Sequence, residues 1–327
     1  MEVAQALKHD DVPLTREQAS ALLSRWLGRD VGCTGLRSLN GGTCSAVFRL
    51  EFGVPPRCAV VKLQAGEDDD PLPREGGRLA YLRQHTTVRS PRVYLQDDSR
   101  EVVPYSFLLL ECLPGVNLGA ARLSPEHRIA VEQELASALI ELHSHKADTF
   151  HGIGDGPGLA DWGDAFLPSL EENRLDMADF LTPDTLEKVD AVLPLAQGAF
   201  GGPGEPTLIH NDLSPGNITV DKGGDGWHLS GLVDPVGLQY ADVEKELAYL
   251  GASDTVGDAF FQGYASERPL RKGYQYRRLF YWLDTYMTHV WLGFGPEFHD
   301  RIAITCDRIK TMGCSGIRGV RGDPALN

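Results

Sequence analysis

The stretch from residue 208 to 218 constrains this chain more than any other. It reads Leu-Ile-His-Asn-Asp-Leu-Ser-Pro-Gly-Asn-Ile, so an apolar lead carries a His-Asn-Asp triplet onto a loop, and Asn217 follows Asp212 by five residues. A further carboxylate, Asp234, comes at the end of the apolar segment Leu232-Val. Phosphoryl transfer needs such a set: one Asp at the attacking hydroxyl, and an Asn and a second Asp to hold Mg²⁺ against the triphosphate. The run therefore predicts a phosphoryl-transfer site.

Each piece of this run also has a purely structural interpretation. Ser214-Pro-Gly216 makes a good turn in any protein, His210 alone is typical of a packed core residue, and an Asp at a strand end often caps a neighbouring segment. The order and spacing of the whole set are what favour the catalytic interpretation.

A lysine inside an apolar strand is the second informative feature. Lys62 interrupts Ala59-Val-Val-Lys-Leu63, where an unpaired charge would be costly. Glu75, thirteen residues further on, is the natural partner, and Lys62 would then point at the α- and β-phosphates of a nucleotide with Glu75 fixing it. The alternative is a lysine at a strand edge whose amine reaches solvent.

Two further segments are candidates for nucleotide contacts. Gly41, Gly42 and Thr43 lie between two predicted strands and could place backbone N–H groups over phosphates, although a glycine pair there also suits an ordinary hairpin turn. Glu111 and Leu113, at the junction between the strand-rich and helical parts, would offer backbone groups to adenine. The adenine contact is inferred from the position of these residues alone.

The chain is long enough for two structural units, since 327 residues exceed what one core usually absorbs. Residues 1–113 are rich in strand patterns, 114–312 in helical ones, and 313–327 form a Gly- and Arg-rich tail expected to fray. Helices are expected at 15–28, 74–84 and 273–309, and two more should begin at Ser124-Pro and Thr182-Pro. Strands are expected at 46–52, 58–63 and 105–112, and residues 218–220 and 229–233 should form a hairpin.

Composition limits the partners and the compartment. The formal net charge of −15, with no basic run, argues against nucleic acid and membrane as main partners. The N-terminal residues carry early charges and no apolar core, so no signal peptide is expected. The six cysteines form no C-x-x-C pair and are expected to be reduced thiols of a cytoplasmic protein.

Together these motifs resemble the aminoglycoside phosphotransferase and choline kinase superfamily, in order from about residue 36 to 310. The resemblance implies an α+β, bilobal protein-kinase-like fold, with a small antiparallel-sheet N-lobe, a larger helical C-lobe and an ATP site between them. It implies that Asp212 is the catalytic base, that Asn217 and Asp234 are Mg²⁺ ligands, and that Lys62 contacts phosphate. The sequence departs from the family at Asn211, where Gly is common; Asn tolerates unusual backbone angles better than most residues.

A narrower resemblance follows Asp234. The run 234–248 is similar to the fructosamine (ketosamine) kinase branch, and within it Glu244 and Glu246 are expected to pin the catalytic loop rather than contact substrate. Further on, Trp282, His289 and Trp291 could line an acceptor pocket, with helix-to-helix packing as the favoured alternative.

The sequence thus predicts an ATP- and Mg²⁺-dependent kinase that phosphorylates a hydroxyl of a small molecule. A ketosamine such as a glycated amine is the leading acceptor, and an aminoglycoside or other amino-alcohol is the alternative. A catalytically silent nucleotide-binding protein is the alternative from another class. A dinucleotide-dependent oxidoreductase suits the chain less well, because no helix follows Gly41 and Gly42 to receive a pyrophosphate.

Overall fold

The computed structural model describes residues 12–39, 45–65, 72–201 and 204–314. The chain divides into two compact units: the first comprises Met1–Ala121, Gly216–Asp225 and Leu229–Val236, and the second comprises Arg122–Pro215, Gly226–His228 and Gly237–Asn327. The lobes predicted from the sequence, 1–113 and 114–312, stay a prediction.

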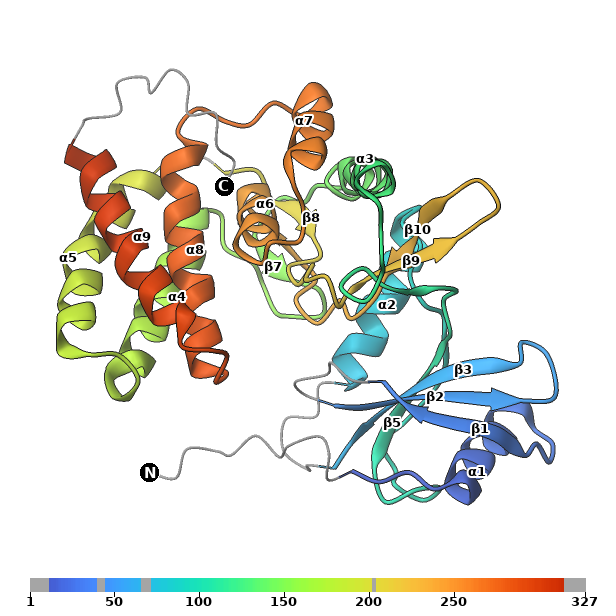
Figure 1. The fold of residues 1–327 in the computed structure, drawn as a ribbon. Helices are drawn as coiled ribbons and strands as arrows, with labels where there is room; N and C mark the ends of the chain where they lie inside the picture. Colours follow the sequence, from blue (N-terminus) through green and yellow to red (C-terminus); the bar gives the residue numbers. More distant parts are fainter. Residues whose placement is uncertain (1–11, 40–44, 66–71, 202–203, 315–327) are drawn as a thin grey trace. The chain divides into compact units, whose positions relative to one another are not determined.

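The first unit contains an antiparallel sheet with a helix on either face (Figure 1). Its described strands run in the order β1 (Cys33–Ser38), β2 (Ala46–Phe52), β3 (Cys58–Gln64), β5 (Ser106–Glu111) and β4 (Val93–Asp97). Helix α1 (Arg16–Leu27) begins at Thr15 with the capping box expected there, and ends at Gly28, whose φ of 64° suits glycine.

The interior strand β5, which lies between β3 and β4, shows why its sequence is an unbroken apolar run. Its side chains alternate between the two faces of the sheet, and both faces are covered. Phe107 and Leu109 join the core that contains the buried side of α1, whereas Leu108 and Leu110 pack with Leu72 and Leu79 of helix α2 (Leu72–His85). The expected buried strand is therefore confirmed.

The expected hairpin also belongs to the first unit for most of its length. Strands β9 (Ile218–Lys222) and β10 (Trp227–Leu232) pair and are extended by β6 (Val116–Asn117). In the second unit, β11 (Gln239–Ala241) lies between β7 (His151–Gly152) and β8 (Thr207–Ile209).

The rest of the second unit is helical. Helices α3 (Pro125–Leu142) and α5 (Pro183–Phe200) begin at Ser124 and Thr182, each with the predicted N-cap and N1 proline. The 273–309 pattern forms two helices, the second of which continues through Gly313 and Cys314, where the tail was expected to begin. The remaining elements are α4 (Trp162–Asp176), the 3₁₀ turn η2 (Met177–Asp179), α6 (Val243–Ala252), α7 (Asp258–Glu267), α8 (Tyr274–Trp291) and α9 (Glu297–Cys314).

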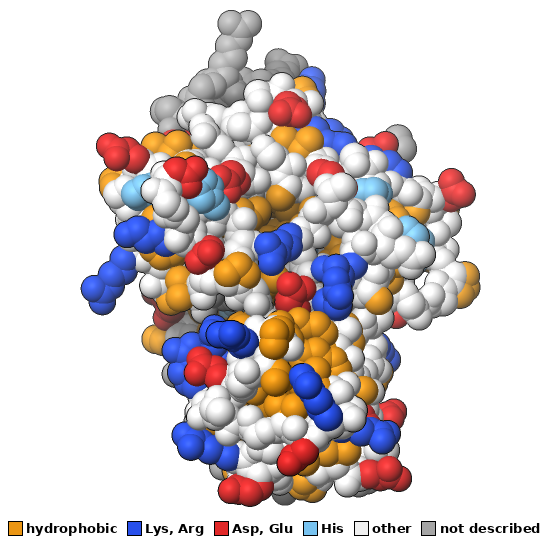
Figure 2. Space-filling view, turned by 90° about the vertical axis from the view of Figure 1, so that its right-hand side faces the viewer, with side chains coloured by type: hydrophobic (Ala, Val, Ile, Leu, Met, Phe, Trp, Pro, Cys, Tyr) orange, Lys and Arg blue, Asp and Glu red, His pale blue; other side chains and the backbone are white. Residues whose placement is uncertain are grey.

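Acidic and basic side chains are interspersed over the face of the molecule drawn in Figure 2, and neither sign gathers in a continuous area there. Among the helices that the structure describes, none is long and apolar enough to cross a bilayer.

Candidate active site

A buried lysine with two carboxylates forms the polar centre of the first unit. Lys62 lies on the face of β3 that α2 covers, since its strand neighbours Val61 and Leu63 point into the opposite core. Its Nζ lies 2.8 Å from Oε2 of Glu75, the partner expected from the sequence. It also lies 2.7 Å from Oδ1 of Asp234, a contact that the sequence did not suggest.

One ammonium group facing two carboxylates leaves this cluster with an excess of negative charge. Burial alone would lower the pKa of Lys62, but the charges of Glu75 and Asp234 outweigh it and raise that pKa. Burial raises the pKa of Glu75 to about 7 against the effect of Lys62, and the negative charge of Asp234 adds to the rise. A further cation at Asp234 would supply the missing positive charge.

The two predicted metal ligands lie at the same end of the β9–β10 hairpin. Asn217 immediately precedes β9 and Asp234 follows the end of β10, and Val233 N–H donates to the carbonyl oxygen of Asn217 at 2.9 Å. Asp234 has a φ of 61°, an uncommon conformation for a residue other than glycine and one often found at functional sites. A carboxylate and an amide oxygen are hard donors of the type that Mg²⁺ takes, so these residues fit that ion.

The loop that carries Asp212 lies in the second unit and is held by α6. Asn211 has a φ of 64°, so it occupies the left-handed conformation that explains why Asn can replace the family's usual glycine. Its N–H donates to Oε1 of Glu246 at 2.7 Å. The Tyr249 hydroxyl donates to Oδ1 of Asp212 at 2.8 Å, and the Thr255 hydroxyl donates to the Leu213 carbonyl at 3.0 Å.

Glu246 links the loop to the helical core. Its Oε2 lies 2.8 Å from Nε2 of His143, and Nδ1 of His143 lies 2.7 Å from the Tyr264 hydroxyl. Burial lowers the pKa of His143, so the neutral ring donates from Nε2 to the carboxylate and accepts from Tyr264 at Nδ1. Burial opposes ionisation of Glu246, but its hydrogen bonds to His143 and Asn211 lower its pKa. The expectation that Glu246 pins the catalytic loop is confirmed.

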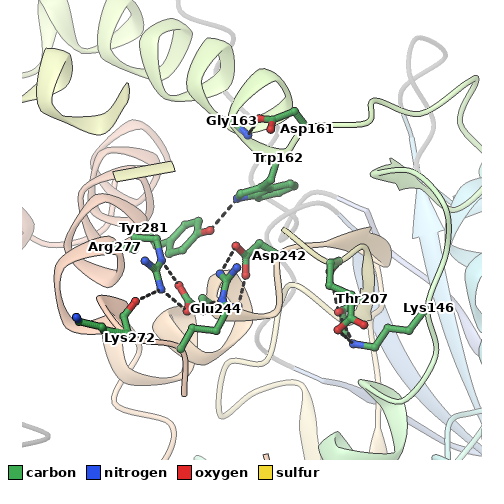
Figure 3. Close-up of polar contacts among 12 residues, drawn as sticks. Lys146, Asp161, Trp162, Gly163, Thr207, Asp242, Glu244, Lys272, Arg277 and Tyr281 are labelled. Atoms are coloured by element: carbon green, nitrogen blue, oxygen red, sulfur yellow. Dashed lines mark hydrogen bonds and ion pairs between the residues drawn. The ribbon is translucent and has the colours of Figure 1, made fainter. Parts of the chain in front are cut away.

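The same expectation for Glu244 is wrong. Both of its oxygens bind arginines: Arg277 donates to Oε2 at 2.6 Å and to Oε1 at 2.8 Å, and Arg271 donates to Oε1 at 2.9 Å. Arg271 also pairs with Asp242, the N-cap of α6. Figure 3 shows the contact of Arg277 with Glu244. The physical reason is spacing, since residues two apart on a helix point in different directions.

This geometry agrees with the comparison to known families. A family model described as the phosphotransferase enzyme family matches residues 35–280, well over half of the chain. The chain belongs to the phosphotransferase enzyme family. The family range covers Lys62, Glu75, the 210–217 loop and Asp234.

Two relatives align with most of this chain. One, named "Probable ketoamine kinase" in Synechocystis sp., is 27% identical over 282 residues and covers 82% of this chain and 88% of its own. Another of that name in Vibrio parahaemolyticus is 25% identical over 278 residues, covering 83% and 91%.

Solved structures share the fold. A structure titled "Putative fructosamine-3-kinase" from Haemophilus somnus has a TM-score of 0.69 at 17% identity and covers 89% of this chain and 96% of its own. A mutant aminoglycoside phosphotransferase in ternary complex with AMP-PNP and hygromycin B has a TM-score of 0.67 at 16% identity, covering 90% and 98%. The expected kinase-like fold, strand-rich at first and helical later, is confirmed.

The remaining predicted nucleotide contacts are the glycine segment and the residues at the end of β5. Gly41, Gly42 and Thr43 lie outside the described residues. Glu111 ends β5, and its N–H already donates to the Arg92 carbonyl at 2.8 Å, which leaves its carbonyl as the group to test for adenine. Leu113 follows β5 as a buried residue.

Two of the three candidate acceptor residues make contacts typical of packing, and the third is exposed. Trp282 donates from its indole N–H to the Ala248 carbonyl at 2.8 Å. The His289 ring lies against Phe298, with ring centroids 4.6 Å apart, and Trp291 is 55% exposed. Their role in acceptor binding stays a prediction.

Tyr249 is the residue of the candidate site that sequence reasoning missed, and the structure places its hydroxyl on Asp212. It directly follows the run 234–248, and a tyrosine among apolar helical residues indicates core. Its three-residue spacing from Glu246 was the available signal, because residues that far apart share a helix face and Glu246 was already expected to hold the loop.

Proposed function

We propose that this phosphotransferase is an ATP- and Mg²⁺-dependent kinase that phosphorylates a hydroxyl of a ketosamine. The observation that carries the chemistry is the hydrogen-bonded Asp212 on a loop fixed by Glu246, five residues before Asn217. The ketosamine assignment draws its support from the two relatives named ketoamine kinases, which this chain matches over most of their length.

Asp212 would act on the acceptor. Its carboxylate orients the attacking hydroxyl and takes its proton as the oxygen bonds to the γ-phosphorus, while the bond to the β–γ bridging oxygen breaks and ADP leaves. The Tyr249 hydroxyl donates to Oδ1 at 2.8 Å and thereby orients the carboxylate. Fixing the carboxylate in this way keeps it pre-organised for the transfer.

Lys62 and the hairpin residues would act on the nucleotide. Asn217 and Asp234 would hold Mg²⁺, which when bound neutralises charge on the phosphates. Lys62 would exchange its contact with Asp234 for one with phosphate, and Glu75 would keep the ammonium in place through their 2.8 Å pair. The glycine loop at 41–43 and the backbone of Glu111 and Leu113 remain the proposed contacts for the rest of ATP. A cytoplasmic location also stays a prediction.

The test is ADP release from Mg-ATP with a panel of possible acceptors. We expect saturable turnover with fructosyl- or ribosyl-amines, such as fructosyl-lysine, and far less with kanamycin or choline. Asp212→Asn should lower kcat by about 10² to 10⁴ and leave ATP binding nearly intact, since positioned acid–base groups contribute about that much. Saturable activity on an aminoglycoside with none on any glycated amine would move the acceptor to the alternative class. No turnover on the whole panel, with ATP bound, would favour a silent nucleotide-binding protein.

A further inference from the structure

The second unit contains a cavity of ≈ 200 Å³ that the mechanism above does not use. Four elements contribute to its wall, namely β7, α4, β11 and α6. Aromatic rings and one amine dominate the lining, which includes His151, Trp162, Phe166, Tyr240 and Lys245. Binding sites for whole drug-sized ligands usually measure about 300–1,000 Å³, so a cavity of this size suits one end of a ligand.

The aromatic part of this wall is rigidly held. The indole N–H of Trp162 donates to the Tyr281 hydroxyl at 2.7 Å, which fixes the ring between α4 and α8 (Figure 3). The rings of His151 and Tyr240 lie 5.1 Å apart on paired strands. The rings therefore form a preformed aromatic wall.

Lys245 is the cation of this cavity, and its charge is incompletely matched. Its Nζ lies 6.0 Å from the centroid of the Trp162 ring. Among the residues that the structure describes, no carboxylate lies within 4 Å of this Nζ and no hydrogen bond satisfies it. Burial lowers its pKa while the more distant Asp284 opposes that effect, and Asp284 itself accepts from Asn173 at 3.1 Å. A half-buried ammonium group without a close partner favours an anion beside it.

Two elements connect the wall of the cavity to the loop that carries Asp212. Lys245 and Tyr249 lie one turn apart on the same side of α6, and Tyr249 holds Asp212. On the sheet, Tyr240 lies opposite Leu208, the residue that leads into the loop. These shared elements therefore set the position of a ligand end in the cavity relative to the carboxylate proposed to meet the acceptor hydroxyl.

We propose that this cavity binds a carboxylate of the acceptor, with Lys245 as the specificity-determining residue and Trp162 as the wall for the adjoining carbons. The inference rests on the proposed function and narrows it: the preferred acceptors are ketosamines of free amino acids, whose α-carboxylate lies next to the glycated amine. A ketosamine without that carboxylate would leave Lys245 unpaired.

The experiment compares two acceptors that differ at one group. Fructosyl-glycine carries the carboxylate, and fructosyl-ethanolamine carries a neutral hydroxyl in its place. For Lys245→Met we expect KM for fructosyl-glycine to rise at least tenfold, equivalent to about 1.4 kcal/mol. We expect kcat, and the KM for fructosyl-ethanolamine, to stay within twofold of the parent values. Lys245→Arg should restore most of the loss. Lys272→Met, which removes an exposed lysine of the same unit, should change neither KM.

Calorimetric titration of fructosyl-glycine into the ATP-free protein measures binding without turnover. Together with the kinetics, it separates the carboxylate-site proposal from the proposed kinase function. Turnover of both acceptors with equal KM values, or a Lys245→Met loss equal for both, would overturn the carboxylate site and leave the kinase proposal standing. No turnover of any ketosamine would overturn the proposed function. Lys245-dependent binding in the titration would then still support the anion site, and absence of binding would overturn it as well.

Discussion

Replacing Tyr249 with Phe tests whether the carboxylate of Asp212, the proposed catalytic base, must be held in place. The change removes one hydroxyl and its 2.8 Å hydrogen bond to Oδ1 of Asp212, and keeps the ring. Burial and the neighbouring charge of Asp212 raise the pKa of Tyr249 well above its usual value, so the hydroxyl stays a donor at every pH used for assay. The variant therefore isolates one positioning contact.

The structure limits the size of the effect. A hydrogen bond to a charged group contributes about 1.5–3 kcal/mol. Asp212 and Tyr249 are both only half-buried, so water can replace part of the lost bond and the lower end applies. A loss of about 1.4 kcal/mol in the transition state lowers kcat about tenfold. That is well short of the fall of 10² or more expected when Asp212 itself is changed.

The assay is steady-state ADP release with saturating acceptor, with KM for Mg-ATP measured alongside. We expect kcat to fall about tenfold and KM for Mg-ATP to stay within twofold, because Tyr249 acts through Asp212 rather than on the nucleotide. Tyr274→Phe is the matched control, since it removes a buried tyrosine hydroxyl from α8 in the same unit. An unchanged kcat, or a KM that rises in step with the fall in kcat, would refute the positioning role.

Three further predictions follow from other contacts. Gly237→Ala should destabilise the chain by about 1–3 kcal/mol, because the new Cβ would lie 2.7 Å from Nδ2 of Asn211; adding Asn211→Gly should restore the denaturant midpoint. Asp234→Asn should raise KM for Mg-ATP at least tenfold, since it removes a charged oxygen from the proposed metal site; an unchanged KM would contradict that role. Because burial lowers the folded-state pKa of His143 below its unfolded 6.5, the stability it contributes is present above pH 6.5 and declines as pH falls below it. Unfolding midpoints at pH 7.5 and 5.5 should show a larger drop for the parent than for His143→Gln.

The sequence was sufficient wherever a single physical requirement determined a contact. A charge inside an apolar strand must find a partner, and this argument led from Lys62 to Glu75. Asn tolerates unusual backbone angles better than most residues, and the positive φ of Asn211 agrees with that expectation. Capping residues fixed where α1, α3 and α5 begin because caps act within one turn.

The sequence was insufficient where several partners compete across large separations. Asp234 is 172 residues from Lys62, and no local rule says that the proposed metal ligand also neutralises the lysine. Glu244 and Glu246 look equivalent in the sequence, yet Glu244 binds Arg277 of α8 and Arg271 of the segment just before it, and the packing of α8 on α6 determines these contacts. Trp162 gave no signal of its own, because its role depends on the ring face left beside Lys245.

Helix α6 connects the two proposed halves of acceptor recognition and thereby limits acceptor length. Lys245 and Tyr249 are separated by about 6 Å along a rigid helix, and Tyr249 in turn fixes Asp212. The separation between the bound carboxylate and the reacting hydroxyl is therefore a property of the fold. In a series from fructosyl-glycine through fructosyl-β-alanine to fructosyl-γ-aminobutyrate, each added methylene moves the carboxylate away from that separation, so kcat/KM should fall along the series. The same series on Lys245→Met should be flat, because the spacing no longer matters when the cation is absent. A fall of equal steepness in both proteins would show that chain length acts elsewhere, and a flat series in the parent would mean that the carboxylate does not reach Lys245.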